Sequence, residues 1–95
     1  MKVTVKFFET LKNIVGKGEV EVDLPEKTDV EGLLKKLLEY YGADFTNYVF
    51  DDKTKKIREY LQIVIDGKCT SFSHGRTVRL KDRSVVTILP PLGGG

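Results

Sequence analysis

Four segments of the chain alternate between apolar and polar residues, a pattern typical of β-strands with one buried face. In the first segment Val3, Val5 and Phe7 share one face, and lysine and threonine occupy the other. A shorter additional strand is expected at residues 77–80. The four main strands are predicted at residues 2–8, 19–24, 60–65 and 85–89.

The segment from residue 30 to residue 41 has the periodicity of a helix. Its apolar positions repeat at intervals of three and four, which forms one apolar stripe along an α-helix. We predict that Asp29 or Thr28 caps the start of this helix and that Gly42 ends it. A short helical turn is expected at residues 9–15. The stripe consists of Val30, Leu33, Leu34, Leu37, Leu38 and Tyr41.

The remaining segments read as turns or have no clear pattern. Residues 43–59 contain apolar side chains that can pack, followed by a polar loop at residues 51–56. Asp66-Gly67 predicts a tight turn after the third main strand. Pro90-Pro91 ends the last strand, because proline cannot donate to a strand ladder.

The order of elements is β-β-α-β-(β)-β with one substantial helix, which predicts an α+β fold. A right-handed crossover places the helix across one face of a mixed sheet, with the first and last strands side by side at its centre. This arrangement is a β-grasp, the ubiquitin-like roll, although the pattern alone leaves other small α+β sandwiches open. The length predicts one domain, residues 1–95, in which residues 90–95 form an extended flexible tail.

Composition excludes several classes of protein. The 40% hydrophobic and 32% charged content is that of a globular domain, and no apolar run approaches the ~18 residues of a membrane span. No signal peptide is visible at the start, so we expect a cytoplasmic protein without membrane contact. The presence of one cysteine, Cys69, and one histidine argues against a transition-metal centre. The net charge of +2 does not indicate nucleic-acid binding.

The last six residues carry the feature with the clearest chemistry. Pro90-Pro91 holds the chain extended, and residues 93–95 have no side chains and therefore fit a narrow channel. Four extended residues span about 13–14 Å, enough for the carboxylate of Gly95 to reach a site inside another protein. Adenylation by that partner would turn the carboxylate into an electrophile. The alternative is a frayed end or an appended linker without function.

Three apolar residues are predicted to face away from the helix. If the first and last strands are neighbours, Phe8, Val64 and Leu89 can form a patch on that face of the sheet. Such a patch is typical of a partner surface. The alternative is a scatter of exposed apolar residues covered by a loop.

These features together resemble the MoaD/ThiS family of ubiquitin-like sulfur carriers, and within it the small subunits of molybdopterin synthase. The resemblance is carried by residues 3–8, Gly16, Leu33 and Leu34, residues 63–67 and, most specifically, residues 88–95. It implies that Gly95 is adenylated and then converted to a thiocarboxylate. Gly94 and Gly95 match the family's diglycine.

The resemblance also implies the partners. These are an adenylating enzyme related to the ubiquitin-activating enzymes, a sulfur donor protein, and the large subunit of molybdopterin synthase, which holds the tail. ATP is used by the adenylating partner, and the carrier itself binds no cofactor and catalyses nothing alone. The implied partner contacts are Phe8, Val64, Leu89, Pro90, Pro91, Leu92 and Gly93.

Several alternatives stay open at this point. The same activated Gly95 could form an isopeptide with lysines, as in a protein modifier, or the domain could be a non-catalytic interaction module. Thiamin rather than molybdopterin, and tungsten rather than molybdenum, are also open. A reactive role for Cys69 beside Lys68 is the less favoured interpretation, because the family's sulfur is carried on the carboxylate. His74 is expected to be a surface residue.

Overall fold

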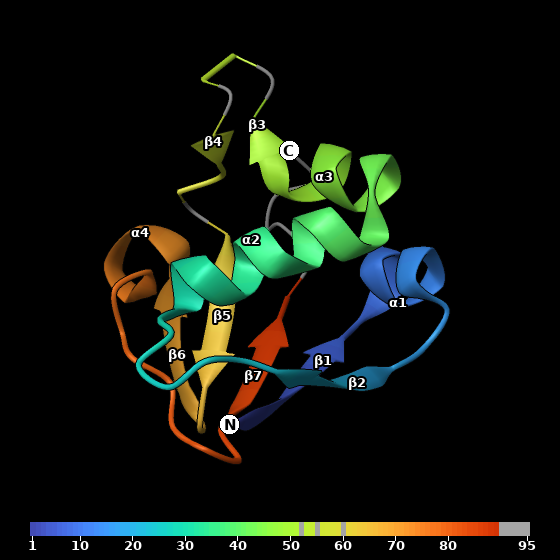
Figure 1. Ribbon diagram of the computed structural model, residues 1–95. Coiled ribbons are helices and arrows are strands. Elements are labelled where there is room, and N and C mark those ends of the chain that lie inside the picture. The colour runs from blue at the N-terminus through green and yellow to red at the C-terminus, as the bar shows by residue number, and fades with distance from the viewer. Residues whose placement is uncertain (52, 55, 60, 90–95) are drawn as a thin grey trace.

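A five-stranded mixed sheet forms the centre of the protein (Figure 1). The computed structural model describes residues 1–51, 53–54, 56–59 and 61–89. The sheet order is β2-β1-β7-β5-β6, in which β1 and β7 pair in parallel and the other neighbours are antiparallel. This confirms the predicted fold and the pairing of the first and last main strands. The strands are β1 (Lys2–Phe7), β2 (Glu19–Asp23), β5 (Gln62–Ile65), β6 (Lys68–Ser71) and β7 (Val85–Ile88).

Four helices and a small two-stranded ribbon complete the described structure. Figure 1 shows α2 crossing one face of the sheet, with α3 beside its C-terminal half. In the described ranges no helix is both long and apolar enough to span a membrane. These elements are α1 (Glu9–Val15), α2 (Val30–Tyr41), α3 (Ala43–Val49), α4 (Phe72–Gly75), β3 (Phe50–Asp51) and β4 (Lys56–Ile57).

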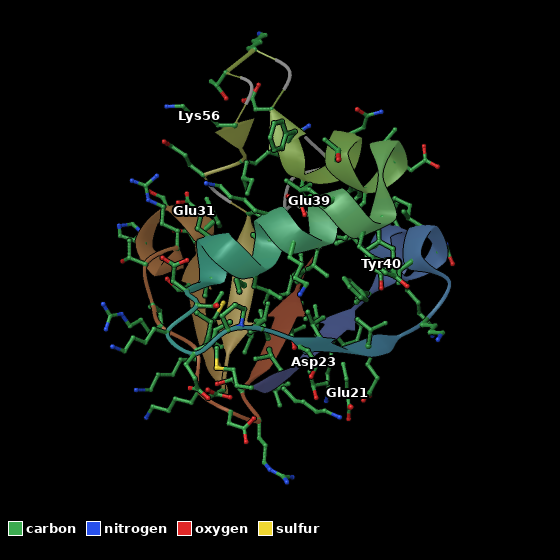
Figure 2. The ribbon with its side chains drawn as sticks, viewed as in Figure 1. Glu21, Asp23, Glu31, Glu39, Tyr40 and Lys56 are labelled. Atoms are coloured by element: carbon green, nitrogen blue, oxygen red, sulfur yellow. The ribbon has the colours of Figure 1, made fainter. Side chains whose placement is uncertain are left out.

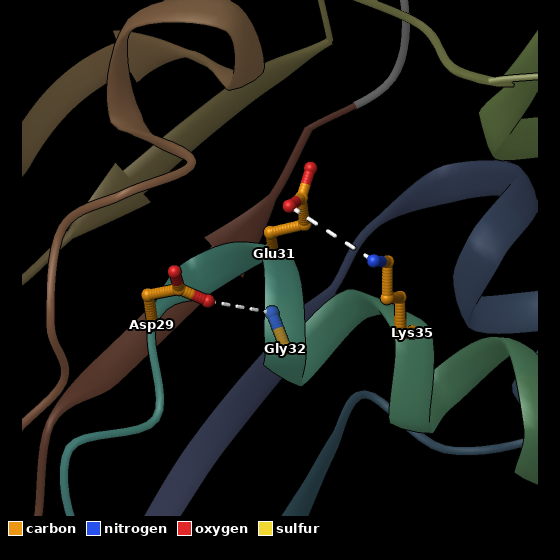
Figure 3. Close-up of polar contacts among 4 residues, drawn as sticks. All are labelled: Asp29, Glu31, Gly32 and Lys35. Atoms are coloured by element: carbon orange, nitrogen blue, oxygen red, sulfur yellow. Dashed lines mark hydrogen bonds and ion pairs between the residues drawn. The ribbon is translucent and has the colours of Figure 1, made fainter.

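The boundaries of α2 follow from its end residues (Figure 3). The carboxylate of Asp29 accepts a hydrogen bond from the backbone N–H of Gly32 at 2.8 Å, so Asp29 is the N-cap. The hydroxyl of Thr28 instead donates to the Pro25 carbonyl. Gly42 ends the helix with a φ of 76°, a conformation that favours glycine.

Aromatic side chains join the sheet to α2 and α3. The ring of Phe7 meets Tyr41 and Phe45 edge to face, each with centroids 6.1 Å apart. Phe45 and Val49 are fully buried on α3. The segment without a clear sequence pattern therefore supplies part of the core, through a helix too short to show a periodicity of its own.

The prediction of an additional strand at residues 77–80 is wrong. In the described structure that segment makes only an isolated bridge, Asp29 with Arg79, and Leu80 is buried with its N–H donating to the Thr28 carbonyl. The fifth strand is β6, which follows the predicted Asp66-Gly67 turn directly. Alternation did not reveal β6 because it lies at the sheet edge and its four residues are mostly polar.

The strand boundaries differ from the prediction by one or two residues. β2 ends at Asp23 instead of residue 24, and β5 begins at Gln62, with Leu61 outside the strand. β1 ends at Phe7, so Phe8 is the extended residue that precedes α1, and the last strand ends at Ile88. Tyr60, the predicted start of the third main strand, lies outside the described residues, and so does the predicted tail, residues 90–95.

We predict that Gly67→Ala lowers the free energy of unfolding by about 1 kcal/mol, because both turn residues between β5 and β6 have positive φ. The values are 48° at Asp66 and 88° at Gly67. Thermal unfolding measures the effect. Gly18→Ala is the matched control, since Gly18 is not among the positive-φ glycines and its added Cβ would meet only Lys12 Cε at an ordinary 3.6 Å. Equal stability of the two variants would contradict the assigned turn.

Candidate functional site

The end of the two central strands brings Phe8 and Leu89 to the same place. β1 and β7 pair with Phe7 opposite Ile88, so the next residues, Phe8 and Leu89, come side by side. The N–H of Leu89 donates to the Gln62 carbonyl at 3.0 Å, which continues the pairing of β7 with β5 through Leu89. Phe8 and Leu89 therefore belong to the face of the sheet opposite α2, which we call the outer face.

Exposure differs between these two residues. The side chain of Phe8 is 48% exposed, whereas Phe7 beside it is buried, and Leu89 is half-buried. Tyr40 and Val78 are the other large hydrophobic side chains exposed in the described part of the chain. An aromatic ring left open to solvent on a sheet face offers apolar contact area to a partner.

Val64 lies on the same face of the sheet, but it is not directly beside Phe8 or Leu89. It pairs with Thr87 on one side and Cys69 on the other, and it is half-buried. The β5 residue beside Leu89 is Gln62. The three predicted residues thus share a face, with Val64 diagonal to Leu89. We call the set Phe8, Gln62, Val64, Thr87 and Leu89 the outer patch.

Basic side chains flank the outer patch on the side of Phe8. A shallow depression beside Phe8 is lined by Lys6, Lys12, Lys17 and Glu19. Sequence reasoning missed this group because the lysines come from β1, α1 and the loop before β2, and only the fold assembles them. The combination of an exposed ring and three ammonium groups suits a partner surface that is apolar and acidic.

A carboxylate fixes the opposite end of β7. Asp66 accepts hydrogen bonds from the Ser84 hydroxyl at 3.0 Å and from the Val85 N–H at 2.8 Å. Ser84 is buried, at 3% exposed, and its carbonyl accepts from the Thr4 N–H. The sequence indicated Asp66 only as a turn residue. In the structure it ties the β5–β6 turn to the first residue of β7, which sets the position of that strand.

The single cysteine borders the outer patch on β6, beside Val64, and the single histidine is on α4. Cys69 is exposed, and its Sγ donates to the Gln62 side-chain carbonyl at 3.3 Å. His74 is exposed as expected, with Nδ1 2.9 Å from the Ser71 hydroxyl at the start of α4. Ser71 also accepts from the His74 N–H, so this pair serves the helix cap.

The described side chains provide binding surfaces more than reactive groups. Among them no group of three or more His, Cys, Asp or Glu is placed to hold a metal ion. Burial raises the pKa of the Tyr41 and Tyr48 hydroxyls above 10.0, with the neighbouring Tyr40 adding to the effect at Tyr41. Both tyrosines are on α2 and α3, away from the outer face. The predicted reactive atoms, at Gly94 and Gly95, lie outside the described residues, as do Pro90, Pro91, Leu92 and Gly93.

A mixed sheet with parallel central strands under one crossing helix defines a ubiquitin-like β-grasp protein. The sequence model of the ThiS family matches residues 5–95, and the chain belongs to this family. The resemblance to the MoaD/ThiS sulfur carriers is thereby confirmed.

Individual relatives agree with this assignment. The chain is 30% identical over 95 residues to a molybdopterin synthase sulfur carrier subunit of Caenorhabditis elegans, with 100% of this chain and 99% of the relative covered. It is similar to a putative molybdopterin converting factor, subunit 1, from Pyrococcus furiosus, with TM-score 0.74, 28% identity and coverage of 97% and 99%. SAMP1 from Haloferax volcanii, with TM-score 0.79, 19% identity and full coverage of both chains, shares the fold.

Proposed function

We propose that this protein is the sulfur carrier subunit of a molybdopterin synthase and that Gly95 carries the sulfur. A partner enzyme adenylates the Gly95 carboxylate: a carboxylate oxygen bonds to the α-phosphorus of ATP, and pyrophosphate leaves. A sulfide equivalent from a sulfur donor protein then attacks the carbonyl carbon, and AMP leaves with that oxygen. The resulting thiocarboxylate donates its sulfur to a pterin precursor in the synthase large subunit.

The observation that carries the proposal is the full-length match to molybdopterin synthase sulfur carrier subunits. The geometry of β7 supports it. Residues 90–95 follow directly on β7, a central strand bonded to neighbours on both sides and tied at its start by Asp66. The tail thus starts from a rigid point, which reduces the conformational freedom lost when a partner binds it.

The outer patch supports the same proposal by its position. It includes Leu89, the last described residue of the chain, with Phe8 and Gln62 on its two sides, so a partner that contacts Phe8 and Leu89 binds next to the residue that precedes the tail in the sequence. The partner's channel accepts the side-chain-free residues 93–95, and the patch contributes affinity. ATP and the sulfur donor are bound by partner enzymes, and the carrier's only reactive group in these steps is its terminal carboxylate.

We predict that deleting Gly95, or adding one residue after it, abolishes thiocarboxylate formation and leaves the fold intact, because the carboxylate is then misplaced. Intact-mass measurement after incubation with the activating enzyme, ATP and a sulfur donor shows loading as replacement of one oxygen atom by sulfur. Circular dichroism checks the fold. Full loading of the extended protein, with its extra residue still attached, would refute the proposal, and lysine conjugates through Gly95 would instead indicate a protein modifier.

We predict that Cys69→Ser leaves adenylation and sulfur loading nearly unchanged, since the described contact of this thiol is a hydrogen bond to Gln62 that a hydroxyl can replace. Gly94→Phe serves as the comparison variant and should block adenylation by filling the channel. Mass spectrometry of the acyl-adenylate and of the thiocarboxylate in wild type and both variants measures the two steps. Loss of sulfur loading in Cys69→Ser would assign the thiol a part in the transfer.

We predict that Phe8→Asp weakens binding to the synthase large subunit by more than ~1–2 kcal/mol, the range for a central apolar contact. The Tm should change little, because the side chain is 48% exposed in the free protein. Val78→Asp is the matched control, since Val78 is 41% exposed and its carbonyl accepts from the Val30 N–H at the start of α2, away from the outer patch. Calorimetric titration measures affinity. Unchanged affinity for Phe8→Asp together with a large loss of stability would contradict the assigned face.

A further inference from the structure

The edge of the sheet at β2 is open to a further strand. β2 pairs with β1 on one side and ends the sheet order on the other. The N–H of Leu24 donates to Met1 and the N–H of Phe7 donates to Gly18. Because bonded pairs alternate in an antiparallel ladder, the peptide groups of Val20 and Val22 point to β1. Those of Glu19, Glu21 and Asp23 point to the open edge.

A side-chain contact confirms this direction. The Lys36 ammonium on α2 donates to the Asp23 carbonyl at 2.8 Å, across the open edge. This lysine occupies one end of the edge and leaves the peptide groups of Glu19 and Glu21 facing outward. An unpaired edge of this kind is a template for pairing with another chain.

A groove of about 630 Å³ runs between β2 and α2, with an apolar floor and charged residues, among them Lys17 and Lys36, in its lining. Val20, Val22, Leu37 and Tyr41 supply much of its apolar lining, and Tyr40 stands at its side with 78% of its surface exposed. The rings of Tyr40 and Tyr41 meet edge to face with centroids 4.9 Å apart. Because the Tyr40 ring is so exposed, it contributes little to the stability of the free protein, but it is well placed to contact a bound chain.

The two faces of β2 differ in charge. Figure 2 shows Tyr40 on the α2 side of β2, and Glu21 and Asp23 projecting to the opposite side. On β1, Lys6 is the cross-strand neighbour of Glu19 and Lys2 that of Asp23, whereas Glu21 faces Thr4. Glu21 therefore has no cationic residue directly opposite it on β1; Lys2 and Lys6 are its diagonal neighbours, and a residue added on its open side would lie directly beside the carboxylate.

The acidic residues on the outer side of β2 favour one kind of added strand over others. In an added strand, residues on the outer side lie beside the acidic residues of β2, where opposite charges stabilise and like charges destabilise the pair. A second copy of this chain pairing through β2 would place acidic residues against acidic residues. A strand with basic residues on that side and apolar residues on the groove side fits both faces.

We propose that the edge of β2 and the groove beside it bind an extended segment of a protein partner in which basic and apolar residues alternate. The segment adds to the sheet as a sixth strand. Its apolar side chains enter the groove against Val20, Val22 and Tyr40, and its basic side chains lie beside Glu19 and Glu21. The groove is on the α2 side of the sheet, and the acidic residues of β2 are on the outer side, where Glu19 also lines the depression beside Phe8. Tyr40 and Glu21 are not part of the outer patch.

The first experiment titrates the full chain, labelled with ¹⁵N, with an end-blocked peptide of alternating lysine and valine, Lys-Val-Lys-Val-Lys-Val-Lys. We expect shifts in β2 and α2 and about tenfold slower hydrogen exchange at the Glu19 and Glu21 amides, which gain partners in the added strand. One control peptide has glutamate in place of lysine. A second has the same composition with the lysines and valines in two blocks. Equal binding of the block peptide, or protection at β6 instead of β2, would overturn the proposal.

The second experiment uses variants of the protein. Tyr40→Ala should weaken binding of the alternating peptide about tenfold, as expected for an aromatic contact at the centre of an interface. Glu21→Lys should weaken it about fivefold and improve binding of the glutamate peptide. Val78→Ala, at an exposed residue outside the groove, is the matched control and should bind as wild type.

Sulfur loading of Gly95 separates this proposal from the proposed function. Tyr40→Ala and Glu21→Lys should load as wild type, because neither residue belongs to the tail or the outer patch. Wild-type affinity of both variants for the alternating peptide would refute the strand-addition site, whatever their loading. Loss of peptide binding with normal loading would support it.

Discussion

The parallel pairing of β1 with β7 is the constraint on which the rest of the structure depends. Parallel neighbours cannot be joined by a tight turn, so the chain between them has to leave the sheet and return. All the other elements lie in that connection, and α2 covers the face that the two strands leave apolar. The same pairing sets Phe8, from the beginning of the chain, beside Leu89, near its end. The outer patch exists because of this single contact between distant segments.

β7 is held both at its start and along its length. Asp66 holds Ser84 and Val85 at one end, and the ladders to β1 and β5 hold the strand along its length. Whatever follows Leu89 therefore departs from a defined point and direction. For the proposed carrier this matters physically, because a tail anchored on a rigid strand can be delivered into a partner's channel without reordering the domain.

The two faces and the β2 edge of the sheet differ in their chemical character. The inner face is covered by the helices, and the outer face presents an exposed aromatic ring with lysines around it. The β2 edge presents peptide groups between the groove beside α2 and a row of carboxylates. The outer patch and the β2 edge differ in charge, so they favour partners of opposite character.

The local pattern of residues by itself determined much of this protein. The alternation of Val3, Val5 and Phe7 identified the buried face of β1, and α2 was bounded by Asp29 or Thr28 at its start and by Gly42 at its end. The chemistry of the tail stays a prediction. These signals work because strand and helix periodicities and capping depend on residues close in sequence.

Only the tertiary structure decided which segments became neighbours. It assigned the fifth strand to Lys68–Ser71 instead of residues 77–80, placed Gln62 beside Leu89, and left Glu21 opposite a threonine. An edge strand needs no apolar alternation, and a register joins residues far apart in sequence. The edge strand β6 therefore showed no alternation, although it pairs with β5 through a two-residue turn. The registers of β5 with β7 and of β1 with β2 leave no local trace, because they result from pairing between distant segments.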